Sequence, residues 1–290
     1  MKKILIAVML VMAPIAAFAE MVDVESPVPA GSTLVLNIRR IGLDWSQTTV
    51  RNAAAYSDSP IQQLSADSQD FIRGVGDIAL EYEHGRFKWE NALFTEYGRT
   101  RLKPTGAPTV SNENADKILL SSNASYAVWE AYSFKFGPTA RSQYETEYTR
   151  NGDAPRRNLA RVNAGLALFD HAIIRDLYLV GVYEYDFTFP VDVSKFALEF
   201  GWRLEYNIKE GVRISTNGYY REYLDYSYFL GVDLERDLSA TLRLDTNLWN
   251  NFNAGPYIQY RRAKSREADV YASNMMVGVS FNYITSFGLR

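Results

Sequence analysis

The chain has 290 residues and a formal net charge of −3, with 22% charged and 47% hydrophobic residues. The absence of cysteine excludes a disulfide framework, a lipid-modified N-terminal cysteine and thiolate metal sites. The charge is too small to favour a nucleic-acid partner, and the 20 tyrosines and 15 phenylalanines favour strands.

The first residues are typical of a secretory signal peptide. Lys2 and Lys3 precede an apolar stretch at residues 4–12, and Ala17 and Ala19 supply the small residues of a cleavage site. A membrane anchor is the alternative, but a spanning helix needs about 20 apolar residues. We expect a signal peptide at 1–19, cleaved after Ala19, and one domain at 20–290. Removing two lysines from 31 basic residues leaves 29 against 34 acidic residues, a formal charge of −5.

Alternation with period two dominates the rest of the chain. Between residues 195 and 206, apolar or aromatic residues at even positions alternate with small or charged residues at odd positions. Such a segment predicts a strand with one apolar and one polar face. We expect strands at residues 33–48, 69–83, 86–98, 114–127, 132–147, 157–169, 177–189, 195–207, 211–224, 226–236, 238–249, 253–264 and 270–284.

This division gives an odd number of strands, whereas single-chain bacterial barrels normally have an even number. Apolar residues keep to even positions throughout 211–248, so this stretch can hold two long strands instead of three. We therefore expect about 12 strands, with about 10 and about 14 as alternatives.

The connections between the strands favour a transmembrane barrel over a soluble sandwich. Short turns are predicted at 84–85, 129–131, 170–176, 208–210 and 236–237, and long polar loops at 50–68, 99–113 and 148–156. Outer-membrane barrels have short periplasmic turns and longer outer loops. Aromatic residues near strand ends, among them Phe169, Tyr178 and Tyr223, are expected to form interfacial girdles. The predicted fold is all-β: a transmembrane antiparallel up-and-down β-barrel in the bacterial outer membrane.

Several runs in the first half of the mature chain resemble a known family. They are Leu43 to Gln47, Phe87 to Leu93, Tyr97-Gly98 and Asp116 to Leu120. These runs are similar to an uncharacterised family of outer-membrane barrel proteins, known mainly as a domain of unknown function. The resemblance implies a barrel of about this size and assigns no catalytic residue.

Charged residues opposite the apolar stripes are expected to line the lumen. They are Arg73, Asp77, Glu96, Arg141, Arg161, Glu184, Asp186, Glu199, Arg203, Arg213 and Arg243. Charges removed from bulk water need partners or a wet pore. Water in the centre would make a narrow channel, whereas side chains paired across the centre would close it. Barrels of about 8 strands are filled and those of about 16–18 strands are open, so about 12 leaves both outcomes.

Basic residues gather in the predicted outer loops. In the last loop region, 261–269, Arg261, Arg262 and Arg266 are candidates for binding phosphates of lipopolysaccharide, because guanidinium groups bind phosphate strongly. An ordinary solvated loop is the alternative. Other expected partners are outer-membrane lipid and, during biogenesis, the outer-membrane assembly machinery, and we expect a monomer.

Three functions remain open. The first is a narrow passive channel for small hydrophilic solutes, and the second is a structural or surface-interaction barrel with a closed lumen. The third, an outer-membrane hydrolase, is disfavoured because His84 and His171 both fall in predicted periplasmic turns. Nearby carboxylates such as Glu184 and Asp186 suit salt bridges better than acid–base chemistry. No motif indicates a cofactor or metal site, so we expect no enzyme activity, cofactor or metal.

Overall fold

The structure is a computed structural model that describes residues 32–289 except 60, 66–69, 103–109, 132 and 151–154. The predicted signal peptide at 1–19 lies outside the described residues. Among the described residues, no helix is long and apolar enough to cross a membrane. The strands are β1 (Ser32–Arg51), β2 (Asp70–His84), β3 (Phe87–Leu102), β4 (Val110–Tyr126), β5 (Trp129–Ala131), β6 (Phe134–Thr146), β7 (Asn158–Phe169), β8 (Ile174–Asp186), β9 (Val193–Lys209), β10 (Val212–Tyr226), β11 (Leu234–Trp249), β12 (Phe252–Ser265) and β13 (Ala272–Gly288).

The sheet closes on itself. Consecutive strands pair antiparallel, β1 pairs with β13, and β4 pairs with β6. The three-residue β5 pairs only with β6 and extends one connection, so the closed barrel has 12 strands. This confirms the expected fold and the expected strand count. Because β1 pairs with β13, the first and last strands of the described barrel wall are not open edges, which is the condition for a sheet to stand in lipid.

The apolar face of each strand points outward. Trp45 is 67% exposed, whereas its neighbours Asp44 and Ser46 are buried in the interior. The same inversion holds on β9, where Phe196, Leu198 and Phe200 are exposed between buried Lys195, Ala197 and Glu199. Such a barrel presents hydrocarbon-compatible side chains to lipid and charged ones to the lumen. The protein is an outer-membrane β-barrel.

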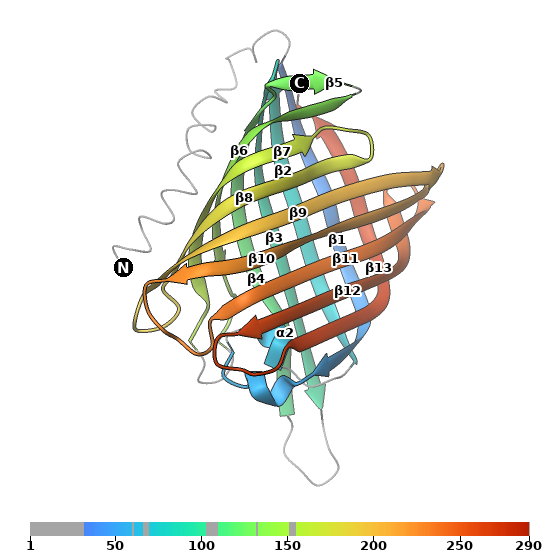
Figure 1. Cartoon of the computed structure of the whole chain (residues 1–290). Helices are drawn as coiled ribbons and strands as arrows, with labels where there is room; N and C mark the ends of the chain where they lie inside the picture. The colour runs from blue at the N-terminus through green and yellow to red at the C-terminus, as the bar shows by residue number, and fades with distance from the viewer. Residues whose placement is uncertain are drawn as a thin grey trace.

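The two ends of the barrel differ. One end, here named the turn end, holds the start of β1, the end of β13 and the short turns, including Gly85 and Gly211 with positive φ. The opposite loop end holds the longer connections, among them η1 (Ala53–Tyr56) and α2 (Gln62–Ser65). In Figure 1 the turn end lies at the top, with β5 and the C-terminus, and α2 lies at the bottom.

Two expectations on local structure are wrong. Arg236 and Asp237 do not form a turn but lie inside β11, and the connection from β10 falls at 227–233. The region therefore holds two long strands, the possibility that the even-position pattern had indicated. Among the expected girdle residues, Phe169 is buried, and Tyr178 and Tyr223 point inward because they bond to lumen carboxylates.

Candidate functional site: the charged lumen

The strand alternation places the predicted lumen residues on the inner face of the barrel. Odd positions face inward on β2, β6, β7, β9, β10 and β11, and even positions do so on β3 and β8. The inward set comprises Arg73, Asp77, Glu96, Arg141, Arg161, Glu184, Asp186, Glu199, Arg203, Arg213 and Arg243. These residues divide between two levels of the lumen.

In the loop-end half, paired charges run round the barrel from strand to strand. We name them the charge ring: Asp44, Arg73, Glu96, Lys117, Glu145, Arg161, Glu184, Lys195, Glu199, Arg221, Asp237 and Arg261. Neighbours in this order are joined by ion pairs or sit opposite one another in the strand register, except Lys195 and Glu199, which lie four residues apart on the inner face of β9. Asn274 and Thr48 complete the circuit between β12 and β1. The six carboxylates and six cations of the ring cancel in charge.

Glu184 is the centre of the ring on one side of the lumen. This carboxylate is 1% exposed and lies 2.6 Å from Nε of Arg161, 3.2 Å from Nζ of Lys195 and 3.6 Å from Arg221. Tyr223 donates a further hydrogen bond to it at 3.2 Å. Three cations therefore share one buried carboxylate, and its removal would take one counter-charge from each of them, leaving Glu145, Asp186, Asp233 and Glu199 as their remaining partners.

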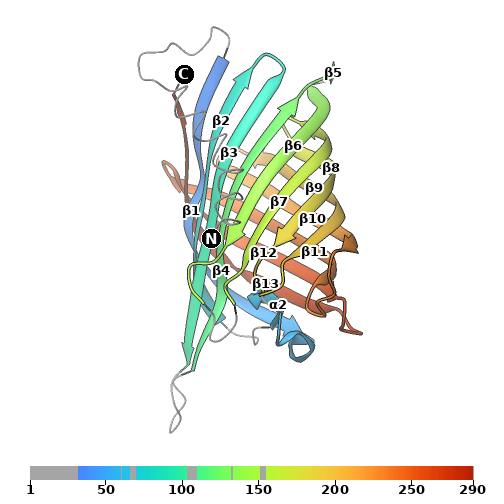
Figure 2. The ribbon, with the colours of Figure 1, turned by 90° about the vertical axis from the view of Figure 1, so that its left-hand side faces the viewer.

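The first loop-end connection folds into the barrel mouth and contacts the ring. Gln63 of α2 accepts a hydrogen bond from Arg261 (3.4 Å) and donates one to Glu96 (3.5 Å), while its backbone oxygen accepts one from Asn274 (2.7 Å). Leu64 is fully buried in an apolar cluster. Tyr56 fixes the segment, because its hydroxyl donates to Val270 O at 2.8 Å. Figures 1 and 2 both show α2 at the loop end. We name residues 53–59 and 61–65 the inward loop.

The turn-end half of the lumen is looser, and we name it the vestibule. Its residues are Lys88, Lys135, Asp170, Arg203, Glu205 and Arg213. The side chains of Arg203 and Arg213 are 30% and 29% exposed, and their ion pairs are long, at 3.5 Å to Glu90 and 3.6 Å to Asp245. Nε of Arg203 is itself buried without a hydrogen-bond partner among the described atoms, so solvent access follows from the exposed fraction of the two side chains. Water therefore reaches this half of the lumen.

One carboxylate in the vestibule is held by two ammonium groups. Asp170, in the turn after β7, lies 2.5 Å from Nζ of Lys88 and 2.8 Å from Nζ of Lys135. Burial alone would raise the pKa of Asp170, but the two lysines outweigh it and lower the pKa below its ordinary value. At the loop end the balance is opposite, since burial raises the pKa of Glu147 to about 7.

A small cavity lies in the lumen wall beside Arg141 and Tyr178. It has a volume of about 10 Å³ and is lined by Asn123, Thr139, Arg141, Asn163 and Tyr178. Oδ1 of Asn163 is buried without a hydrogen-bond partner in the described part of the chain. A polar cavity of this size is suited to a single water molecule.

Several lumen residues were missed at the sequence level. Arg39 and Arg40 are adjacent, so regular alternation allows only one to face inward, yet both do. Arg39 pairs with Glu81 (2.9 Å) and Glu90 (2.5 Å), and Arg40 donates to Asn282 (2.7 Å). A β-bulge between Ile38 and Ile41 supplies the extra residue. The signal was available, because the apolar residues of β1 change from even to odd positions there.

The predicted rim residues lie in three different places. Arg261 is not at the rim, because β12 extends to Ser265 and its odd positions face inward, where Arg261 pairs with Asp237 at 2.7 Å. Arg262, one residue on, faces outward. Arg266 lies in the loop, with its guanidinium 4.0 Å from the ring centroid of Tyr226.

The two histidines lie at the turn end. His171 has a local structural role: its Nδ1 accepts backbone N–H groups of Ile173 (3.2 Å) and Ile174 (3.3 Å), and its ring stacks on Phe134 at 4.1 Å. His84 ends β2 opposite Phe87. The hydroxyl of Thr139 donates a hydrogen bond to Asn123 in the lumen wall and is not paired with either histidine.

Comparison with solved structures finds other outer-membrane barrels at low sequence identity. The translocator domain of the autotransporter NalP from Neisseria meningitidis is 12% identical, with 94% of this chain and 96% of that chain covered and a TM-score of 0.35. Outer membrane phospholipase A from Escherichia coli is 11% identical, with 91% and 96% covered and a TM-score of 0.44. An outer membrane channel from Pseudomonas putida F1 is 12% identical, with 89% and 97% covered and a TM-score of 0.40.

Sequence comparison points in the same direction. No curated protein matches the chain significantly. The runs Phe87 to Leu93, Tyr97-Gly98 and Asp116 to Leu120 lie within a matched segment, whereas Leu43 to Gln47 precedes it. Residues 67–148 match the family described as "Protein of unknown function (DUF3078)", which confirms the resemblance to an uncharacterised family of outer-membrane β-barrels.

Proposed function

We propose that this outer-membrane barrel has a closed lumen and acts as a structural or surface-interaction component of the envelope. One observation carries the proposal: the charge ring is buried around nearly its whole circumference. Glu184, Glu199 and Arg221 are each less than a twentieth exposed. A solute-sized aqueous pore would expose these side chains to water, and a hydrated pore needs no such pairing.

The inward loop supports the same proposal. The inward loop occupies the mouth of the barrel beside the ring and is anchored by apolar burial of Leu64 as well as by the polar contacts of Gln63. An ionic layer and a loop that contacts it through Gln63 both lie in the loop-end half, which supports a closed lumen.

Single-channel recording in planar bilayers tests the proposal. Wild-type protein is expected to give no discrete conductance steps. Replacing Arg161, Glu184 and Arg221 together by alanine, which removes bulk from the ring centre, is expected to produce steps. The matched control is Arg236→Ala with Glu222→Ala, an outward-facing ion pair (2.8 Å) near the same end, which is expected to stay silent.

A narrow passive channel for small hydrophilic solutes is the second candidate. The partly exposed Arg203 and Arg213 favour it, since they indicate a wet vestibule at the turn end. Discrete steps from wild-type protein would select this candidate and reject the closed lumen. A silent ring variant would show that the ring is not the seal.

We also propose that the protein is not an enzyme, that it is a monomer assembled by the outer-membrane assembly machinery, and that the signal peptide is cleaved after Ala19. The bonding of His171 to the turn backbone supports the first point. Loss of a hydrolytic activity on replacing His84 and His171 would contradict it. N-terminal sequencing of mature protein is expected to begin at Glu20.

A further inference from the structure

A cluster of cations lies on the outer wall of the barrel near the loop end, where β11 and β12 pair. Even positions of both strands face outward, and Arg236 sits opposite Lys264 in the register. Nη1 of Arg236 donates to the hydroxyl of Tyr271 at 2.9 Å. The guanidinium of Arg262 lies 4.3 Å from the centroid of the same tyrosine ring. Two cations therefore contact Tyr271, and Lys264 lies opposite one of them in the register.

These cations, with Arg266, form what we name the rim cluster: Arg236, Arg262, Lys264 and Arg266. Arg236 pairs with Glu222 (2.8 Å) and Lys264 with Glu235 (2.6 Å). Among the described residues, Arg262 and Arg266 form no ion pair and stack on aromatic rings, and Nη1 of Arg266 also donates to Tyr228 O at 3.0 Å. A guanidinium stacked on a ring keeps its N–H edge available to an anion.

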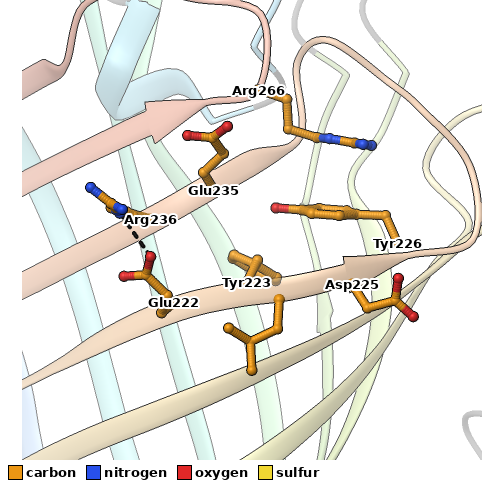
Figure 3. A pocket seen from close by; sticks show the side chains of 8 residues that line it. Glu222, Tyr223, Asp225, Tyr226, Glu235, Arg236 and Arg266 are labelled. Carbon is orange, nitrogen blue, oxygen red and sulfur yellow. Dashed lines mark hydrogen bonds and ion pairs between the residues drawn. The ribbon is translucent and has the colours of Figure 1, made fainter.

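A cavity opens beside the cluster, where the ladder between β10 and β11 ends at Glu222 and Arg236. It has a volume of about 450 Å³. Figure 3 shows Glu222 and Arg236 facing each other on one side, and Arg266 above the ring of Tyr226 on the other. Its lining holds two cations, Arg236 and Arg266, and three carboxylates, those of Glu222, Asp225 and Glu235. The other two cations of the cluster, Arg262 and Lys264, lie outside this lining. The lining is polar and can donate and accept hydrogen bonds.

The position of the cluster identifies its ligand. Exposed Tyr220 and Phe229, 40% and 60% accessible, lie beside it and mark the boundary between apolar and polar surroundings. Long loops of outer-membrane barrels face the cell exterior, so the outward wall at this level meets the headgroups of the outer leaflet. Unpaired guanidinium groups there require anions, and a phosphate accepts several N–H donors at once.

We propose that the rim cluster binds a phosphate group of an outer-leaflet glycolipid, with Arg262 and Arg236 as donors and the cavity beside Arg266 receiving sugar of the headgroup. The site replaces the loop site expected from the sequence, because Arg261 faces the lumen and Arg236 and Lys264 take its place. It lies outside the barrel, so it is independent of whether the lumen is open or closed.

Binding of lipopolysaccharide to purified full-length protein tests the proposal. Replacing Arg236, Arg262 and Lys264 together by glutamine is expected to weaken binding of lipopolysaccharide carrying both lipid A phosphates by about tenfold, equivalent to about 1.4 kcal/mol. Arg262→Gln alone, which breaks no ion pair, is expected to weaken it by about threefold. The matched control, Arg175→Gln, changes an exposed arginine at the turn end and is expected to have no effect.

Inorganic phosphate as a competitor and dephosphorylated lipopolysaccharide as a ligand show whether binding depends on the lipid phosphate. Dephosphorylated lipopolysaccharide is expected to bind the wild type no better than the phosphorylated lipid binds the triple variant, and inorganic phosphate is expected to compete weakly. Equal binding of wild type and both variants would overturn the proposal, as would equal binding of the dephosphorylated lipid. Retarded migration of unboiled protein on gels checks that each variant is folded.

Discussion

The two halves of the lumen carry similar residue types but use them differently. In the loop-end half, Glu184 and its three cations are buried and closely paired. In the vestibule, Arg203 and Arg213 are almost a third exposed and their ion pairs are long. Buried charges depend on their partners, whereas solvated charges have water as a substitute. Charged residues with the same alternation pattern in the sequence therefore differ greatly in their contribution to the stability of the fold.

The largest expected effect comes from the ring. Glu184→Gln removes the carboxylate but keeps the shape of the side chain, and leaves Arg161, Lys195 and Arg221 without a shared counter-charge. We expect the free energy of unfolding to fall by about 3–5 kcal/mol, measured by reversible urea unfolding in lipid vesicles. A loss below about 1 kcal/mol would mean that water reaches the ring as it reaches the vestibule.

The two ends are also expected to respond to pH in opposite directions. Glu147 has a pKa raised from 4.5 to about 7, so the folded state retains its proton between these values and stability falls as pH rises through them. The lowered pKa of Asp170 stabilises the fold above pH 3.8, and this contribution is lost as pH falls. Urea unfolding measured as a function of pH tests both effects. Glu147→Gln is expected to abolish the loss of stability with rising pH, which is on the order of 1–3 kcal/mol. Asp170→Asn is expected to abolish the loss of stability with falling pH.

A glycine at the boundary of the two halves supplies the next test. A Cβ on Gly201 would lie 2.2 Å from Cζ of Tyr178, whose hydroxyl bonds Glu199 of the ring at 2.9 Å. Gly201→Ala is expected to displace the aromatic ring of Tyr178 and to lower the free energy of unfolding by about 1–3 kcal/mol. Gly74→Ala is the matched control, since its nearest atom would be 3.9 Å away. Equal unfolding free energies for the two variants would contradict the contact.

The smallest effect is expected in the vestibule. Glu205 pairs with Arg175 at 3.3 Å and with Arg213 at 3.9 Å, with a side chain that is 28% exposed. Glu205→Gln is expected to lower the free energy of unfolding by less than about 1 kcal/mol in the same urea assay. A loss as large as that of Glu184→Gln would remove the distinction between the two halves.

The sequence predicted the barrel, its strand count and the inward face of most strands, because period-two alternation determines which side chains share a face. Depth was not predictable in the same way. Arg161 and Arg203 carry the same alternation signal, yet one is in the buried ring and the other in the vestibule. Depth depends on strand tilt and on the register between neighbours, and neither is written in a single strand.

Two further features depended on irregular geometry. The inward loop follows from packing of Leu64 and Tyr56 against strands more than 150 residues later in the chain, which local pattern does not specify. Asp237 was missed because a turn was expected at residues 236–237; with β11 continuous there, it falls on the inner face as the register partner of Arg221.

The bulge in β1 has a consequence for how the barrel seals. β1 meets β13 along the seam that joins the first and last strands, and the phase of its apolar residues changes at Ile38 and Ile41. If β13 paired with β1 in a register shifted by one residue, apolar side chains of β1, before or after the bulge, would face the lumen. The two segments of β1 therefore each specify the register with β13, and only one register places the apolar residues of both segments on the outer face.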